Sequence, residues 1–436
     1  MNRPQKIFLG VISVAVASLI IAGTIITTYQ KSSEKLQVVV TFYPLYFFAS
    51  EIGKERVEVS MLIPDNAEVH SWQPAISDML KVEKAKIFVY NGAGLEPWVE
   101  DFLGAVKNKP VIVDTSQNIP IQLSPYLQEV LESATNLLAQ NCTQISLPQS
   151  MPIQPSNTTA YSLHLNQNIV TLQLNISHES KILLAFNKTF SFELRNTTVL
   201  SPALSLNHTL LASYSLSFVH IFHLDPGIYE MVFNASNQNE IYFTVFPFEV
   251  TEGEEEEEHG HGIYDPHIWL DPLLAKIQVR NILEGFKAAD PENAHFYQTN
   301  AETLLKKLDK LHSDFTNGLK NRTKNAIICS HLAFNYMGKR YGFNVHAAIG
   351  ITADREPSPT ELAKLVDLIN TLQLHYVFVE PGYSDRYMQT LANQTGAGIL
   401  VLDAVHGRTG EHANLDYFQI MYENLKNLRT GLEVVD

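Results

Sequence analysis

The chain has 436 residues, enough for two or three domains, and a formal net charge of −15 from 31 basic and 46 acidic residues. Such an acidic surface argues against nucleic acid and anionic lipid headgroups as partners, and it is compatible with a cationic ligand. Only two cysteines occur, Cys142 and Cys329, so the sequence predicts no disulfide framework.

Residues 1–35 are predicted to be a membrane anchor. Arg3 and Lys6 precede an uncharged apolar run from Ile7 to about Thr28, long enough to cross a hydrocarbon core of about 30 Å. Positive charge before the run predicts a cytoplasmic N-terminus, with the rest of the chain outside. No Ala-x-Ala cleavage site and no cysteine for lipid attachment occur near its end, so we favour an uncleaved anchor over a cleaved signal peptide. Both alternatives place the body of the protein outside the cytoplasm.

Residues 36–123 are predicted to form an N-terminal βα lobe. Three apolar runs rich in β-branched residues are typical of buried parallel strands, and two stretches between them have helical spacing. The runs are 57–63, 85–90 and 110–115, and the helical stretches are 78–84 and 97–107.

Residues 124–250 have a different pattern and are predicted to be an inserted all-β domain. Apolar and polar residues alternate with a period of two, and Asp-Pro-Gly at 225–227 is typical of a hairpin turn. We expect a small antiparallel sandwich over about 152–250, preceded by an apolar helix or linker at 124–140. This domain is either a module that binds carbohydrate or a partner, or a spacer.

Asn-x-Ser/Thr sequons are more numerous than the roughly four expected by chance, and most lie between residues 141 and 236. Glycosylation of an outward-facing domain is one explanation, and chance is the other. The acceptors are Asn141, Asn157, Asn175, Asn187, Asn196, Asn207, Asn234, Asn321 and Asn393.

Residues 263–436 return to an α/β pattern. Residues 263–320 are predicted to complete the first lobe with a helix over 273–289 and a second helix to about Lys320, with Asp290 as its N-cap. The second helix would be about 45 Å long, enough to join two lobes. Residues 321–436 predict a C-terminal βα lobe. Its strands are expected at 325–330, 344–349, 375–380 and 398–403, and its helices at 332–341, 359–371, 384–395 and 412–430.

Potential metal donors follow four of the predicted strands: His70, His331, Glu380 and Asp403. Ligands of open α/β sheets bind outside the carboxyl ends of the strands, so these side chains can meet. Together with His267, they supply the imidazole and carboxylate donors that suit Zn²⁺. Taken singly, each residue is more often a helix cap or a satisfied loop contact.

Several segments resemble the zinc/manganese-type (cluster A-I) solute-binding proteins of metal ABC importers. The resemblance covers about 37–119 and 263–431 and includes EVHSWQP, DPHIWLDP, SHLAF, FVEPGYSDR and VLDAVHG. It implies two βα lobes joined by a long rigid helix, with the metal between them and an ABC permease as partner. The ligands of the family carry over to His70, His267, His331 and Asp403.

The same resemblance favours Zn²⁺ over Mn²⁺ as the ligand. Zinc-binding members have histidine as the third donor, where manganese binders typically use glutamate. They often carry an acidic, His-rich loop before the second histidine, and EGEEEEEHGHG occupies that place here, within the segment 251–262. We expect this segment to collect cations, with a solvated acidic linker as the alternative. Its candidate donors are Glu254, Glu255, Glu256, Glu257, Glu258, His259 and His261.

The sequence therefore predicts an extracytoplasmic zinc-binding protein with a monomeric ectodomain, not an enzyme, that serves a metal importer. Glu380 is expected to accept the remaining N–H of one ligand histidine. The alternatives are a manganese- or iron-uptake protein, an extracellular zinc hydrolase and an adhesion protein that acts through the inserted domain. A hydrolase needs an open coordination position and a general base such as Glu380.

Overall fold

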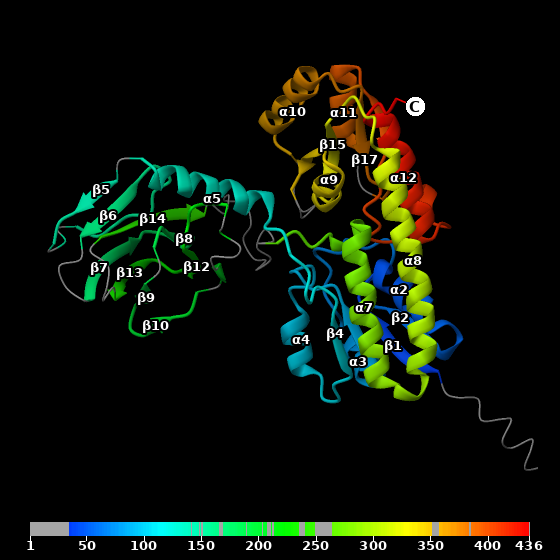
Figure 1. Cartoon of the computed structure of the whole chain (residues 1–436). Coiled ribbons are helices and arrows are strands. Elements are labelled where there is room, and N and C mark those ends of the chain that lie inside the picture. Colours follow the sequence, from blue (N-terminus) through cyan, green and yellow to red (C-terminus); the bar gives the residue numbers. More distant parts are fainter. Residues whose placement is uncertain are drawn as a thin grey trace, which may run out of the picture. The chain divides into compact units, whose positions relative to one another are not determined.

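The computed structural model describes residues 35–435 except for a set of internal positions. These are 141, 148, 150, 165–168, 189, 203, 207–210, 212, 235–239, 249–263, 351–356 and 383–384. The predicted N-terminal anchor and the predicted acidic loop lie outside the described residues. Within the described part, no helix is both long and apolar enough to cross a membrane. The chain divides into two compact units, one made of residues up to 122 together with 264–436, the other of residues 123–263 (Figure 1).

The first unit contains two parallel four-stranded sheets, with the strand orders β2-β1-β3-β4 and β16-β15-β17-β18. Their strands are β1 Leu36–Val40, β2 Val57–Met61, β3 Ile87–Tyr90, β4 Val111–Asp114, β15 Ala326–His331, β16 Asn344–Ile349, β17 Tyr376–Val379 and β18 Gly398–Val401. Their helices are α2 Tyr43–Gly53, α3 Ile76–Lys84, α4 Val99–Ala105, α9 Asn335–Tyr341, α10 Pro359–Leu372, α11 Arg386–Thr395 and α12 Tyr417–Gly431. The predicted α/β class is confirmed, since the strands are apolar and parallel and helices connect them.

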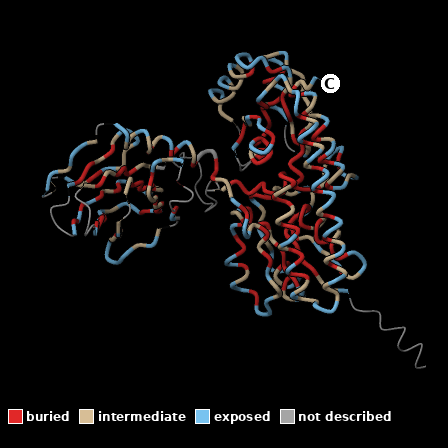
Figure 2. Tube along the Cα trace, viewed as in Figure 1, coloured by how far each residue is buried: buried red, intermediate tan, exposed pale blue. Residues whose placement is uncertain are grey.

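Two long helices precede the second sheet in the chain, and the second of them packs beside helices of both sheets. The helix α7 (Pro272–Ala289) begins at the N-cap Asp271, whose Oδ1 accepts a hydrogen bond from Leu273 N at 2.9 Å. The helix α8 (Ala294–Gly318) packs against α7, against α2 beside the first sheet and against α12 beside the second. One continuous hydrophobic core therefore extends through the unit, as the buried segments in Figure 2 show.

The start of α8 differs from the prediction. Residues 291–293 form a single 3₁₀ turn, and the α-helix begins only at Ala294. The Asp290 carboxylate does not cap the helix. It accepts hydrogen bonds from Asn293 Nδ2 at 2.7 Å and from the Tyr297 hydroxyl at 2.6 Å, and these contacts draw it away from the backbone N–H groups.

The described residues of the second unit form a β-sandwich that is covered by the helix α5 (Pro125–Leu138). Four strands form one sheet (β10-β9-β13-β7) and six form the other (β11-β12-β8-β14-β6-β5), and all described pairs are antiparallel except β5 with β6. The strands are β5 Thr143–Ile145, β6 Ala160–His164, β7 Ile169–Ile176, β8 Ser180–Phe186, β9 Ser191–Arg195, β10 Val199–Leu200, β11 Leu204–Leu206, β12 Phe218–Leu224, β13 Gly227–Asn234 and β14 Glu240–Phe248. The helix α5 packs on β14 and β6 of the larger sheet.

The inward-facing residues of both sheets form the core of the second unit, including Leu172, Leu184, Met231 and Phe243. The predicted hairpin at 225–227 is wrong, because β12 and β13 on either side of this turn belong to different sheets. Alternation with a period of two indicates which face of a strand is buried, but it does not determine which strands pair.

A buried carboxyl group lies at the carboxyl edge of the first sheet. Glu96 Oε1 accepts hydrogen bonds from Thr41 Oγ1 at 2.6 Å and Asn91 N at 2.9 Å, and its Oε2 accepts one from Gly92 N at 3.1 Å. Burial raises the pKa of Glu96 to about 7, although these three hydrogen bonds oppose the shift.

This pKa gives a stability prediction. The folded-state pKa lies above the unfolded value, so the contribution of Glu96 is fully present below pH 4.5 and is lost as the pH rises through 7. We expect wild type to lose about 3 kcal/mol relative to Glu96→Gln between pH 4.5 and pH 8. Urea unfolding monitored by tryptophan fluorescence measures this, since Trp72, Trp98 and Trp269 all lie in the first unit. The exposed Glu100→Gln is the matched control. A difference between wild type and Glu96→Gln that is the same at both pH values would contradict the prediction.

Candidate metal centre

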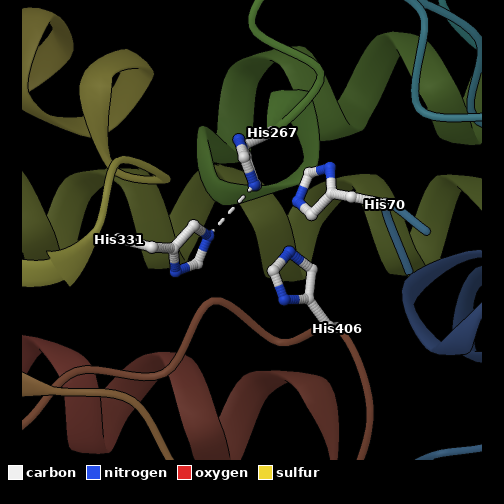
Figure 3. A group of neighbouring side chains, drawn as sticks. All are labelled: His70, His267, His331 and His406. Atoms are coloured by element: carbon white, nitrogen blue, oxygen red, sulfur yellow. Dashed lines mark hydrogen bonds between the residues drawn. The ribbon is translucent and has the colours of Figure 1, made fainter. Parts of the chain in front are cut away.

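Four buried histidines converge in the first unit: His70, His267, His331 and His406. His70 follows β2, His331 is the last residue of β15, and His406 follows β18, so all three lie at the carboxyl ends of parallel strands. His267 immediately precedes the 3₁₀ turn at 268–270 that leads into α7. Figure 3 shows the four rings facing one another across a common centre. Each offers one potential ligand atom, and these atoms lie within 4.8 Å of one another.

The distances suit a four-coordinate metal ion. Ring centroids are 5.1–5.4 Å apart for every pair except His70 and His331, which are 6.2 Å apart. The Nε2 atoms of His267 and His331 are 3.4 Å apart. Two nitrogens bound tetrahedrally to Zn²⁺ at 2.0–2.1 Å are also separated by about 3.4 Å. The buried Nε2 of His70 has no hydrogen-bond partner, as expected of an atom held for an ion.

Carboxylates lie behind three of the rings. Asp265 Oδ1 is 2.8 Å from His267 Nδ1, Glu380 Oε2 is 2.5 Å from His331 Nδ1, and Glu380 Oε1 is 3.2 Å from His406 Nδ1. When the Nδ1 atoms carry the protons, the Nε2 atoms present lone pairs to the centre. Carboxylates in this position set the tautomer and orientation of ligand histidines and raise their basicity.

The segment that carries His267 is anchored from several sides. Asp265 Oδ1 also accepts a hydrogen bond from His267 N at 3.0 Å, and Asp265 Oδ2 accepts one from Asn335 Nδ2 at 3.0 Å. The Tyr336 hydroxyl donates to Asp265 O at 2.9 Å, and Asn91 Nδ2 donates to Pro266 O at 2.9 Å. A residue that follows β3 and two residues of α9 therefore hold the segment that carries this ligand.

Burial and neighbouring charges determine the protonation of the cluster. Burial lowers the pKa of His70 and of His267 well below the usual histidine value, and charge on the neighbouring imidazoles adds to the effect. For His406 burial also acts to lower the pKa, but the Glu380 carboxylate outweighs it and the pKa is raised. For Glu380 burial acts to raise the pKa, but His331 and His406 outweigh it and lower the pKa to about 2. The neutral form of His70 and His267 is the one that binds a metal.

The structure differs from the prediction at the fourth ligand, since Asp403 is not a member of the group. Its Oδ1 accepts a hydrogen bond from Val405 N at 2.7 Å, and its Oδ2 lies 2.7 Å from His412 Nδ1. Val405 has a positive φ of 60°, and the turn at this residue brings His406 to the cluster instead. Sequence reasoning missed His406 and Asp265, although both lie in the quoted motifs VLDAVHG and DPHIWLDP. The loop candidates from Glu254 to His261 lie outside the described residues.

Two parallel sheets joined by a long helix, with histidines of both halves meeting at the strand ends, define a two-lobed α/β binding protein. A family model described as zinc-uptake complex component A, periplasmic (ZnuA), matches residues 38–137 and 212–431, well over half of the chain. The protein therefore belongs to the ZnuA family.

Curated relatives are similar at low identity. The zinc-binding protein AdcA of Streptococcus pyogenes is 24% identical over 402 residues, which cover 92% of this chain and 56% of the relative. The chain thus spans little more than half the length of these first relatives. The high-affinity zinc uptake system protein ZnuA of Bacillus subtilis is 24% identical over 412 residues. This match covers 92% of this chain and 89% of the relative. The zinc-binding lipoprotein AdcA of Streptococcus pneumoniae is 22% identical and covers 96% of this chain and 60% of the relative.

Solved structures share the fold. The Zn(II)-bound ZnuA-like domain of Streptococcus pneumoniae AdcA has a TM-score of 0.55 and 20% identity and covers 92% of this chain and 100% of that domain. The laminin-binding protein Lmb of Streptococcus agalactiae, described as a bifunctional protein with adhesin and metal-transporting activity, has a TM-score of 0.57 and 18% identity. The match covers 92% of this chain and 100% of the Lmb chain.

Proposed function

We propose that this protein binds Zn²⁺ outside the cytoplasm through His70, His267, His331 and His406 and delivers it to an ABC-type importer. The observation that carries the proposal is the convergence of four buried imidazoles on one point, within the 4.8 Å separation of their ligand atoms. The zinc-binding names of the relatives and the zinc-uptake description of the family support the same cargo.

The donor set favours zinc over manganese. Imidazole nitrogens suit Zn²⁺, whereas Mn²⁺ prefers carboxylate, carbonyl and water oxygens. The carboxyl groups of Asp265 and Glu380 face the Nδ1 atoms of the ligand histidines and not the common centre. Zinc then replaces its water molecules with four neutral nitrogens, and Glu380 and Asp265 stabilise the bound cation through the rings.

The same geometry argues against the hydrolase alternative. A catalytic zinc ion keeps one coordination position for water or substrate, whereas a structural or transported ion is held by four protein ligands. Glu380 contacts two ligand histidines at their Nδ1 atoms, which is the position of an orienting group and not of a base beside bound water. We therefore propose Glu380 as the group that orients His331 and His406.

Delivery requires a partner and a location. The partner is an ABC permease that accepts zinc from the two-lobed protein. The body of the protein lies outside the cytoplasm, and residues 1–35 anchor it to the membrane in place of the lipid that is implied by the name of the Streptococcus pneumoniae relative. The acidic segment 251–262, with His259 and His261, collects cations for the protein.

Elemental analysis of the purified protein tests the cargo. We expect about one zinc per chain, and competition titration in which Mn²⁺, or Fe²⁺ under anaerobic conditions, displaces little of it. Stoichiometric manganese or iron, held in preference to zinc, would contradict the proposal.

The identity of the fourth ligand, His406 or Asp403, can be tested by substitution. His406→Ala removes a donor, so we expect zinc affinity to fall by more than about 100-fold, beyond the effect of losing an orienting residue. Asp403→Asn keeps an oxygen that can accept from Val405 N, and we expect a loss of about tenfold or less. Zinc titration of both variants against a chromophoric chelator measures the difference. If Asp403→Asn lost more affinity than His406→Ala, the aspartate would be the ligand.

A further inference from the structure

The sequons are concentrated in the second unit. Of the nine acceptors, seven lie between residues 141 and 236, although this unit makes up only about a third of the chain. Neither the metal centre nor the two-lobed fold uses these asparagines. Among the described acceptors, the structure distinguishes exposed asparagines from Asn187, whose side chain and backbone are hydrogen-bonded.

Asn196 is an exposed acceptor. It lies at the tip of the hairpin that joins β9 to β10, where Arg195 pairs with Val199. All three residues of its sequon, Asn196, Thr197 and Thr198, are exposed. A hairpin tip presents the acceptor amide and the following hydroxyl residue together on a short, protruding segment.

Asn157 is a second accessible acceptor. It occupies a bend before β6, and both Asn157 and Thr158 are exposed. The Ser156 hydroxyl accepts a hydrogen bond from Thr158 N at 3.1 Å and donates one to Thr159 Oγ1 at 3.1 Å, so a local side-chain turn presents this sequon.

Asn187 carries the same motif but is blocked. Its backbone N–H donates to Tyr242 O at 3.2 Å, and its side-chain Oδ1 accepts from Tyr242 N at 3.1 Å. Its backbone carbonyl accepts from Ser217 Oγ at 2.9 Å. Both backbone groups and the amide oxygen are thus engaged in holding β8 to its neighbours, and the residue is only partly exposed. It provides an internal control.

We propose that Asn157 and Asn196 are N-glycosylation sites and that Asn187 is not. The donor is an oligosaccharide linked to a lipid phosphate or diphosphate. The amide Nδ2 attacks the anomeric carbon and loses one proton, the new C–N bond replaces the C–O bond to phosphate, and the lipid phosphate leaves with that electron pair. No oxidant or reductant is needed. The proposal rests on the extracytoplasmic location in the proposed function, because such transferases act on the outer side of the membrane.

Peptide mapping by mass spectrometry of the full chain, purified from the cells that naturally make it, tests the proposal. We expect hexose-containing mass additions on the peptides with Asn157 and Asn196 and none on the peptide with Asn187. Asn157→Gln and Asn196→Gln should each lose one glycan mass in the intact protein and keep wild-type zinc affinity.

Unmodified Asn157 and Asn196 in that preparation would overturn the proposal, and occupancy of Asn187 equal to theirs would overturn the accessibility argument. Zinc titration of the same preparation reports on the proposed function separately, so the two can fail independently.

Discussion

His267→Ala is expected to abolish measurable high-affinity zinc binding. This residue is fully buried and links both halves of the site, with its ring 5.1–5.3 Å from each of the other three rings. Its removal leaves three donors and also leaves the buried Asp265 carboxyl group without its imidazole partner. We expect the loss of affinity to exceed the roughly 100-fold that loss of an orienting residue causes.

Two measurements separate this loss from misfolding. Zinc at 1,000 times the wild-type Kd should stabilise the wild-type first unit by about 4 kcal/mol in urea unfolding and should stabilise the variant by far less. The second is the urea-unfolding midpoint of the zinc-free variant, which reports whether the unit still folds. His295→Ala, at an exposed position of α8, is the control and should behave as wild type. If His267→Ala bound zinc with wild-type affinity, the assignment of His267 as a ligand would be wrong.

Gly407→Ala is expected to weaken zinc binding without touching a ligand. A Cβ at Gly407 would lie 2.1 Å from Asp65 O and 2.7 Å from Asp65 Cα, and these are backbone atoms that cannot rotate away. Asp65 precedes His70 by five residues, and Gly407 follows His406 directly. The substitution therefore forces apart the two loops that carry ligands from opposite halves of the unit.

Arg408 stabilises the close contact between the loop of Gly407 and the loop of Asp65. Its backbone N–H donates to Asp65 Oδ1 at 3.0 Å, and its Nη2 is 3.1 Å from Asp65 Oδ2. We expect Gly407→Ala to lose this contact and to reduce zinc affinity by about 10- to 100-fold, mainly through faster zinc release, because His70 and His406 no longer meet. Stopped-flow release of zinc to a chelator measures the rate. Gly104→Ala, at an open position of α4, is the control, and release at the wild-type rate from Gly407→Ala would contradict the prediction.

Most strands and helices of the first unit were predictable from the sequence because each has a local cause. The strand β15 is a run of apolar residues that is buried along its whole length, and α7 begins at an aspartate cap followed by proline. The start of α8 was not predictable, because the Tyr297 hydroxyl competes for the Asp290 carboxylate. That competition exists only once the helix has formed.

The pairing of strands in the second unit also depended on distant residues. Alternation in β12 and β13 identified their buried faces, but the turn between them could equally form a hairpin or cross between sheets. The structure assigns β12 to β8 and β13 to β7 and β9, where their side chains fill one shared core. Side-chain packing in this core therefore favours a turn that leads from one sheet to the other over a hairpin within one sheet.

By itself the sequence determined the α/β class and the apolar strands, because local composition and periodicity encode these features. His70, His267 and His331 were identified as ligands through the resemblance of their motifs to those of a known family. Only the tertiary structure decided that His406 and not Asp403 joins them. The choice depends on a left-handed residue at Val405, on the Asp403 contact with His412 and on the approach of Gly407 to Asp65. The contact of Asp403 with His412 and the approach of Gly407 to Asp65 arise from the packing of the whole unit. No local sequence pattern therefore predicts them.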